Sequence, residues 1–315
     1  MKQLRIKYEA TLKQLFNNFL TSRQALGVTE KTIKTYKAHF QAMSHYLDTD
    51  ELITEFQEEA IEEMIVSMRR KELSANSIKS YLITLRAFFR WCKEKGICDI
   101  TVKPYKGKDI IKEPYTDKEV EALLKKPNLR NCSFTEYRNW VMVCLLLNCG
   151  CRAATLRSIT VQDVNLDHEY ILFRHTKSQR IQTIPLCKQM INILREYLLI
   201  RKGEGSDPLF CSQYGKKLNE AGLRKAIATY NQSRGIKKTS THLYRHTFSK
   251  IFLLDCGGNA FTLQRILGHS TLDMTKHYCN IYDADLINNF DELSPLAIYS
   301  KREKSITKAD IQKRR

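Results

Sequence analysis

The helical spacing of apolar residues along this chain is interrupted over residues 98–120, and this interruption predicts two separate folding units. The interrupting stretch, CDITVKPYKGKDIIKEPYTDKEV, contains two prolines, a glycine and several lysines. Proline, glycine and charge without periodicity are typical of an interdomain linker. At 315 residues the chain also has the length of two domains, because one domain commonly takes about 100–200 residues. The predicted division is a domain at 1–100, a basic linker at 101–114, a domain at 115–299 and a basic tail at 300–315.

Residues 1–100 carry helical patterns alone. Apolar residues recur at spacings of three and four after Thr29, a candidate N-cap. The same spacing recurs in residues 74–96, where Gly96 is expected to end the helix. Similar patterns begin near Tyr8 and near Ile61. We therefore predict an N-terminal domain of four helices.

The second domain is predicted to be mostly helical with a small antiparallel sheet. The sequences TDKE and SFTE are capping boxes that mark helix starts at Thr116 and Ser133, and Gly150 stands where a helix C-cap is expected. Two stretches rich in strand formers, EYILFRH and RIQTIPL, are joined by TKSQ. They predict a β-hairpin with Lys177 at its tip. The expected fold class is thus mainly α.

The charge of the chain favours a polyanionic partner. Lysine and arginine number 52 against 34 acidic residues, giving a formal net charge of +18 and a pI near 9.4. Nucleic acid fits this balance best, although solvated lysines alone account for it equally well. The basic residues expected to contact DNA are Lys31, Lys34, Lys37, Lys79, Arg86 and Arg90 on helix faces, with Lys106 and Lys108 in the linker.

The chain shows no signal peptide and no uncharged run of the roughly 18 residues that a membrane span needs. We therefore expect a cytoplasmic, nucleoid-associated protein of bacterial or mobile-element origin, without membrane contact. A metal site is not expected either. The cysteines include no C-x-x-C pair, and His269 and His277, eight residues apart, lack the spacing of known metal motifs.

Three places in the second domain carry side chains suited to binding or attacking a phosphate. Arg152 follows a predicted helix and a glycine. His242 and Arg245 stand three residues apart and so share one helix face. Further on, His269 precedes Tyr278 by nine residues. Each place alone has an ordinary structural explanation, such as a salt bridge or a core tyrosine, and their order along the chain is more informative.

In that order, with Lys177 on the hairpin tip, these residues resemble the catalytic domain of the tyrosine recombinases, the phage-integrase family. The motifs HLYRHTF and LGHSTLDMTKHY carry most of the likeness. The helix starts T-x-x-T-I-x-x-Y and LSANSIKSYL resemble the family's core-binding domain, so the likeness covers about residues 10–290. It implies a simple two-domain recombinase of the Xer or mobile-element type, whose domains clamp the duplex from opposite faces.

The chemistry of a phosphodiester independently requires these residue types. Its cleavage gathers negative charge on the non-bridging oxygens, and guanidinium groups neutralise that charge through paired hydrogen bonds without losing their own proton. Arg152 and Arg245 are the candidates for this role. Imidazoles titrate near working pH, so His242 and His269 are candidates for hydrogen bonding or proton transfer.

The resemblance assigns the remaining roles. It implies that Tyr278 attacks the phosphate to form a 3′-phosphotyrosine bond, while Lys177 donates a proton to the leaving 5′-hydroxyl. Because that bond retains the energy of the broken linkage, no metal, ATP or other cofactor is required. Tyr282, one helical turn further on, is the competing tyrosine and is expected to pack. Thr155 stands where family members commonly carry glutamate, a departure expected to affect efficiency more than identity.

The implied partners are double-stranded DNA recombination sites and further copies of the chain, in a homo-tetramer on two duplexes around a Holliday junction. Accessory DNA-bending or directionality proteins would be additional partners. Two alternatives share the fold or the chemistry: a DNA-binding regulator that has lost catalysis, and a type IB topoisomerase. The complete set of six site residues argues against the regulator. The helical first domain argues against the topoisomerase, and relaxation of a plasmid without a target site would separate it from a recombinase.

Overall fold

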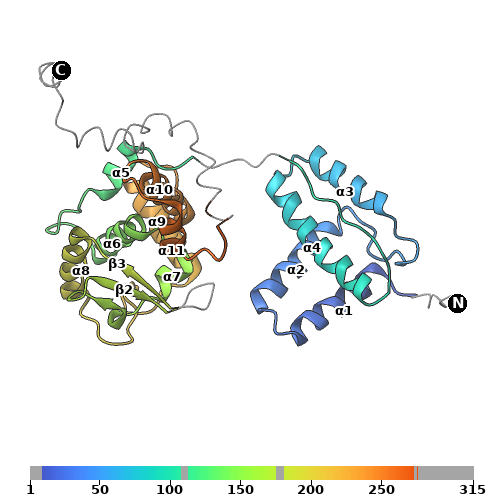
Figure 1. The fold of residues 1–315 in the computed structure, drawn as a ribbon, viewed down its shortest axis with the longest axis horizontal. Helices are drawn as coiled ribbons and strands as arrows, with labels where there is room; N and C mark the ends of the chain where they lie inside the picture. Colours follow the sequence, from blue (N-terminus) through green and yellow to red (C-terminus); the bar gives the residue numbers. More distant parts are fainter. Residues whose placement is uncertain (1–8, 108–112, 175–180, 273–274, 276–315) are drawn as a thin grey trace, which may run out of the picture. The chain divides into compact units, whose positions relative to one another are not determined.

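The structure is a computed structural model that describes residues 9–107, 113–174, 181–272 and 275. Contacts within the chain divide it into two compact units, Met1–Ile111 and Lys112–Arg315 (Figure 1). The described residues are mainly helical and include one small antiparallel sheet. This architecture confirms the predicted fold class.

Four helices make up the described part of the first unit. They are α1 (Leu12–Ala25), α2 (Glu30–Met43), α3 (Glu58–Arg70) and α4 (Ala75–Glu94). The side chains of Thr11, Thr29 and Ser74 cap α1, α2 and α4 by accepting hydrogen bonds from backbone N–H groups of the first turn. Gly96 has a φ of 69° just after α4, which agrees with its predicted place at the end of this helix.

An aromatic core joins the helices of the first unit. Phe16 of α1 stacks on Phe40 of α2 with ring centroids 3.9 Å apart, and Phe88 of α4 packs on Phe16 at 5.3 Å. Aromatic pairs of this kind contribute about 0.5–1.5 kcal/mol beyond the area that they bury. The core thereby fixes the positions of α2 and α4, which carry most of the predicted DNA-contact residues of this unit.

The chain that follows α4 folds back onto the first unit. Val102 is buried in the core, and its carbonyl accepts a hydrogen bond from Arg86 Nε at 3.1 Å. The Thr101 amide donates to a carboxylate oxygen of Glu58 at 2.8 Å. Residues 101–105, the first part of the stretch that the sequence assigns to the linker, therefore pack on the first unit.

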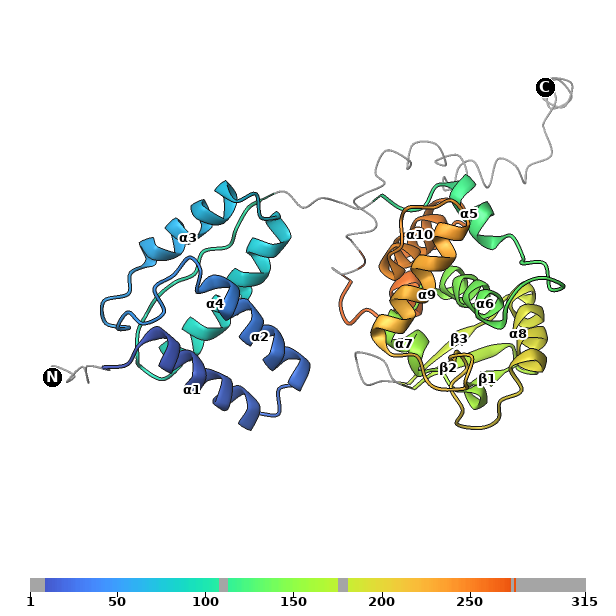
Figure 2. The same ribbon diagram turned by 180° about the vertical axis from the view of Figure 1, so that it is seen from behind.

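The described part of the second unit surrounds one central helix. Helix α6 (Phe134–Cys149), which contains the apolar run WVMVCLLL, is buried on every side over residues 137–146. Figure 1 and Figure 2 both show it between α8 (Lys188–Arg201) and α10 (Thr241–Leu254). The other helical elements described in this unit are α5 (Asp117–Leu124), α7 (Ala153–Ser158), the short 3₁₀ helix η1 (Val161–Asp163), α9 (Glu220–Ser233) and α11 (Ala260–Leu267).

Three helix ends in this unit lie where the sequence predicts them. Thr116 and Glu119 form a reciprocal capping box at the start of α5. Ser133 Oγ accepts a hydrogen bond from the Glu136 amide at the start of α6. Helix α6 ends at Gly150, which takes the left-handed conformation with a φ of 59°.

The sheet of the second unit has the strand order β1-β2-β3 and is antiparallel throughout. Its strands are β1 (Val164–Asn165), β2 (Tyr170–Phe173) and β3 (Gln182–Pro185). Strands β2 and β3 pair with Phe173 opposite Gln182, which confirms the predicted hairpin. Immediately after β2, Arg174 Nε donates to Oδ1 of the buried Asp163 in η1 at 2.6 Å. The hairpin tip with Lys177 lies outside the described residues.

Candidate active site

Arg152 is placed by the sharp end of α6. Gly150 turns the chain so that Arg152 becomes the N-cap residue of α7. A Cβ atom at Gly150 would lie 2.6 Å from Phe248 Cδ1 and 2.9 Å from Leu267 Cδ2, so both the space and the positive φ require glycine. The half-buried Arg152 side chain then reaches α11, where Nη1 lies 3.5 Å from the Leu267 carbonyl oxygen to which it donates.

Arg245 lies on the buried face of α10 and is 2% exposed. Its Nη1 donates to the Gly150 carbonyl at 2.9 Å, and its Nη2 donates to the Leu267 carbonyl at 2.9 Å. Nη2 also lies 2.6 Å from His269 Nε2. Because a planar guanidinium held at both terminal nitrogens cannot rotate, these contacts orient Arg245 before any substrate binds.

His269 is held in a single tautomer by its two neighbours. The guanidinium of Arg245 can only donate, so His269 Nε2 must accept, and this assigns the ring proton to Nδ1. Nδ1 then donates to Thr275 Oγ1 at 2.8 Å. Thr275 is fully buried, so the hydroxyl that fixes the ring is shielded from water.

The pKa of His269 responds to three other predicted site residues. Burial lowers the pKa of His269 to about 4, with further lowering by neighbouring cationic groups, which in order of effect are Arg245, Arg152 and His242. His269 is therefore neutral at pH 7. Because such effects fall off with distance, the groups that exert them must lie near the ring.

His242 stands in the first turn of α10, one turn before His246. Its side chain is exposed, and its ring meets the His246 ring edge-on with centroids 4.9 Å apart. His242 is thus an exposed imidazole whose charge also acts on His269. The predicted residues that lie outside the described part of the chain are Lys108, Lys177, His277, Tyr278 and Tyr282.

Two threonines lie near the predicted site residues: Thr275 contacts His269, and Thr155 belongs to α7. The sequence did not single out Thr275, although it stands three residues before Tyr278. Threonine is common on solvated turns, so its type carried no signal of burial or of a bond to His269. Thr155, which replaces the glutamate common in the family, is 5% exposed in α7, and its carbonyl accepts a hydrogen bond from Ser158 Oγ at 2.8 Å.

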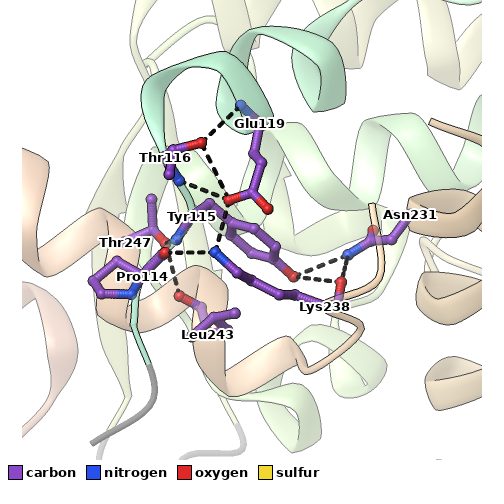
Figure 3. Close-up of polar contacts among 8 residues, drawn as sticks. All are labelled: Pro114, Tyr115, Thr116, Glu119, Asn231, Lys238, Leu243 and Thr247. Carbon is purple, nitrogen blue, oxygen red and sulfur yellow. Dashed lines mark hydrogen bonds and ion pairs between the residues drawn. The ribbon is translucent and has the colours of Figure 1, made fainter. Parts of the chain in front are cut away.

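Helix α10, which carries His242 and Arg245, is anchored at the point where the chain enters the second unit (Figure 3). The Tyr115 amide donates to Thr247 Oγ1 at 2.9 Å, and this hydroxyl donates in turn to the Leu243 carbonyl at 3.0 Å. All three residues are buried. The entering segment and α10 therefore form one connected structure.

The loop between α9 and α10 completes this anchor. Lys238 Nζ donates to the Pro114 carbonyl at 3.1 Å and pairs with Glu119 at 2.8 Å, as Figure 3 shows. Burial acts to raise the pKa of Glu119, but hydrogen bonds from Lys238 and from Thr116 outweigh it and leave the pKa lowered. The side-chain amide nitrogen Nδ2 of Asn231 donates to the Lys238 carbonyl at 2.7 Å, and this bond ties the same loop to α9.

The predicted DNA-contact residues of the first unit differ in their surroundings. Those with exposed side chains are Lys31, Lys34 and Lys37 on α2, Arg90 on α4 and Lys106. Lys79 and Arg86 of α4 are half-buried, and Arg86 Nε donates a hydrogen bond to the Val102 carbonyl. Lys34 lies 3.7 Å from Glu30 one turn earlier, an exposed pair of little energetic weight.

The described residues contain no group of three or more His, Cys, Asp or Glu side chains placed to hold a metal ion. Within the same residues, no helix has both the length and the apolar character needed to cross a membrane. The cationic groups of the site described above fit an anionic substrate.

Two arginines and two histidines around the end of one helix, on a mostly helical unit with a β-hairpin, define a site suited to a phosphodiester. The chain belongs to the phage integrase family: residues 114–285 match the Phage integrase family itself. Residues 13–96 match the N-terminal SAM-like domain of phage integrases. These matches confirm the resemblance found in the sequence.

Similar proteins agree with this membership. The tyrosine recombinase XerD of Staphylococcus epidermidis is 26% identical over 309 residues, covering 91% of this chain and 99% of the relative. Among solved structures, XerH recombinase bound to palindromic difH has a TM-score of 0.74 at 19% identity, covering 92% of this chain and 99% of that one. A lambda integrase tetramer on a Holliday junction has a TM-score of 0.70 at 17% identity, covering 86% and 78%. These structural likenesses establish the fold.

Proposed function

We propose that this chain is a site-specific DNA recombinase that cleaves and rejoins strands through a 3′-phosphotyrosine intermediate and a Holliday junction. The observation that carries the proposal is the convergence of Arg152, Arg245 and His269 at the C-terminal end of α11. Membership of the phage integrase family supports the same activity. A DNA-binding regulator without catalysis has no need of this arrangement.

The two arginines supply positive charge to the phosphate in the transition state. Arg152 approaches from α7 and Arg245 from α10, and both donate to the Leu267 carbonyl. Donors oriented in advance need no reorganisation during the reaction, and the loss of one such donor lowers the rate by about 10²–10³. Arg152→Ala and Arg245→Ala should therefore impair cleavage far more than DNA binding.

His269 acts as a neutral imidazole. With a pKa of about 4 the ring is uncharged at pH 7, and its Nε2 lone pair accepts the hydrogen bond from Arg245, so His269 orients this guanidinium for the phosphate. Thr275 keeps the acceptor nitrogen on the arginine side of the ring. His242, exposed in the first turn of α10, adds a second imidazole to the same phosphate.

The covalent step belongs to Tyr278 and Lys177. The Tyr278 phenol oxygen attacks phosphorus and gives up its proton to a neighbouring base, while the bond from phosphorus to the 5′ oxygen breaks and Lys177 protonates that oxygen. A 5′-hydroxyl of another duplex reverses the step and releases Tyr278. The bond energy is conserved throughout, so the reaction proceeds without metal or ATP.

DNA binding and assembly complete the proposal. The exposed lysines of α2 contact backbone phosphates without reading sequence, which makes the affinity dependent on salt. Four protomers on two duplexes supply the four active sites that exchange of both strand pairs requires. Accessory DNA-bending or directionality proteins act on that assembly, and the protein works in the cytoplasm.

Covalent trapping tests the proposed function. The purified chain is mixed with labelled, nicked fragments of the DNA flanking its own gene, without metal or ATP, and separated on a denaturing gel. We expect a protein–DNA band that Tyr278→Phe abolishes and that the matched variant Tyr282→Phe retains. Both variants should bind the same DNA as the wild type. A band that survives in Tyr278→Phe and is lost in Tyr282→Phe would refute the assigned nucleophile.

A further inference from the structure

The C-terminal turn of α11 gathers contacts from four parts of the second unit. The last four carbonyls of a helix have no partner within it, and they form the negative end of its dipole. Here the Leu267 carbonyl accepts from Arg152 and Arg245, as described above. The Gln264 carbonyl accepts from the His269 amide at 3.1 Å. The remaining two carbonyls of this turn bind a residue of the sheet.

That residue is Gln182, the first residue of β3. Its amide nitrogen Nε2 donates to the Ile266 carbonyl at 2.8 Å and also to the Arg265 carbonyl. Both hydrogens of one side-chain amide are thus used on consecutive carbonyls, an arrangement that fixes the side chain in position and rotation. Gln182 is half-buried, so water competes only in part for these bonds.

Gly268 allows this close approach. It ends α11 with a φ of 62°, and a Cβ atom at this position would lie 2.9 Å from Gln182 Oε1. The same glycine turns the chain so that His269 faces Arg245. One turn of chain therefore orients His269, receives both arginines and holds β3.

We propose that Gln182 is a positioning residue that couples the β2–β3 hairpin, and with it Lys177, to the arginine cluster. Strand β2 is held just after its C-terminal end by the pair between Arg174 and Asp163, which belongs to η1 and is not part of the site. Strand β3 is held by Gln182, whose partners are the carbonyls adjacent to the one that binds both arginines. Lys177 precedes Gln182 by five residues, and Gln182 is the first residue of β3 after it.

Proton transfer to the leaving oxygen depends closely on the position of the general acid. A general acid must lie within hydrogen-bond reach of the leaving oxygen, at about 2.6–3.2 Å between heavy atoms. A displacement of about 1 Å in a reacting group can lower the rate by about 100-fold. Loss of the Gln182 anchor should therefore act on the protonation step carried out by Lys177. This inference rests on the proposed function.

The test separates proton donation from the rest of catalysis. Cleavage is measured on the mapped recombination site with either the natural oxygen or a bridging sulfur at the 5′ position of the scissile phosphate. A thiol ionises near a pKa of about 8.5 and leaves without a proton, so the sulfur substrate bypasses the general acid. The variants are Gln182→Met, which keeps the length and removes both donors, Lys177→Ala, and the control Thr183→Ala on the neighbouring exposed position of β3.

We expect Gln182→Met to cleave the oxygen substrate about 10- to 100-fold more slowly than the wild type and the sulfur substrate at nearly the wild-type rate. Lys177→Ala should show the same selective rescue, and Thr183→Ala should match the wild type on both substrates. An equal loss on both substrates in Gln182→Met would overturn the inference, because it would mean damage to the arginines or to Tyr278. Wild-type rates on both substrates in Gln182→Met would also overturn it.

A second readout needs no DNA and no activity. Hydrogen exchange of the backbone amides of β3 and of the last turn of α11 should accelerate in Gln182→Met and stay unchanged in Thr183→Ala. Unchanged exchange in Gln182→Met would refute the anchor itself. A wild-type protein that forms no covalent adduct would instead refute the proposed function, so the two failures are distinguishable.

Discussion

At the scale of single residues, His269 shows how hydrogen bonds to its two ring nitrogens can fix the tautomer of an imidazole. Arg245 can only donate, so its contact determines that Nδ1 carries the proton, and the Thr275 hydroxyl then accepts from Nδ1. Protonation of Nε2 would place a third positive charge against Arg152 and Arg245 in a partly buried position. The folded protein therefore keeps the His269 ring neutral, and this makes the free energy of unfolding depend on pH.

We predict that the free energy of unfolding decreases as the pH falls from about 6.5 to about 4. In this range the unfolded chain binds a proton at His269 and the folded chain does not, so acid favours unfolding, and below the folded pKa of about 4 the effect levels off. The effect should amount to roughly 1–2 kcal/mol after allowance for the partial exposure of the ring. Urea unfolding of His269→Gln at several pH values should show a flatter dependence than that of the wild type, and an unchanged slope would contradict the prediction.

At the scale of elements, the site is organised around helix ends more than around helix faces. Helix α6 ends at Gly150 and α11 ends at Gly268, both in the left-handed conformation, and each end supplies a carbonyl that accepts a hydrogen bond from Arg245. Left-handed glycines permit the chain to reverse within one residue, so the carbonyls of the last turn stay accessible to side chains from other elements. The arrangement depends on glycine at both positions.

Gly268→Ala tests this dependence, with Gly257→Ala as a matched control. Both glycines have nearly the same positive φ, 62° and 63°, so each substitution carries the same left-handed strain of about 1–2 kcal/mol. A Cβ atom at Gly257 meets nothing within 4 Å, whereas one at Gly268 would lie 2.9 Å from Gln182 Oε1. Thermal unfolding should show the larger loss in Gly268→Ala, and covalent trapping should fail in that variant while persisting in Gly257→Ala. Equal effects would show that the contact with Gln182 is unimportant.

At the scale of the whole molecule, the sequence predicts what depends on neighbours in the chain. Periodicity, capping residues and turn chemistry predict the helices and the hairpin, and the order of motifs indicates the family. The contacts that assemble the site join distant residues instead: Arg152 and Leu267 are 115 positions apart, and Gln182 and Arg265 are 83 apart. No local pattern encodes such pairs, so the partners of each arginine and the role of Gln182 emerge only from the fold.

The basic residues of the first unit likewise have roles that the fold distinguishes and the sequence does not. Charge alone makes Lys37 and Arg86 equivalent candidates for DNA contact. In the fold, Lys37 is exposed on α2, whereas Arg86 is half-buried and holds the segment after α4 through the Val102 carbonyl. Removing Arg86 leaves that buried carbonyl without its donor, which costs about 1–3 kcal/mol. Removing Lys37 has no comparable structural cost.

We therefore expect alanine variants of Lys37 and Arg86 to differ when thermal stability and DNA affinity are both measured. Lys37→Ala should keep the thermal midpoint of the wild type and lower the slope of log affinity against log salt by about 0.9, the value for one lost phosphate contact on duplex DNA. Arg86→Ala should lower the thermal midpoint in the absence of DNA, whatever its effect on affinity. An Arg86→Ala protein with wild-type stability would show that residues 101–105 do not depend on this bond, and the argument for its structural role would fail. A salt slope unchanged in Lys37→Ala would remove α2 from the DNA-contact surface.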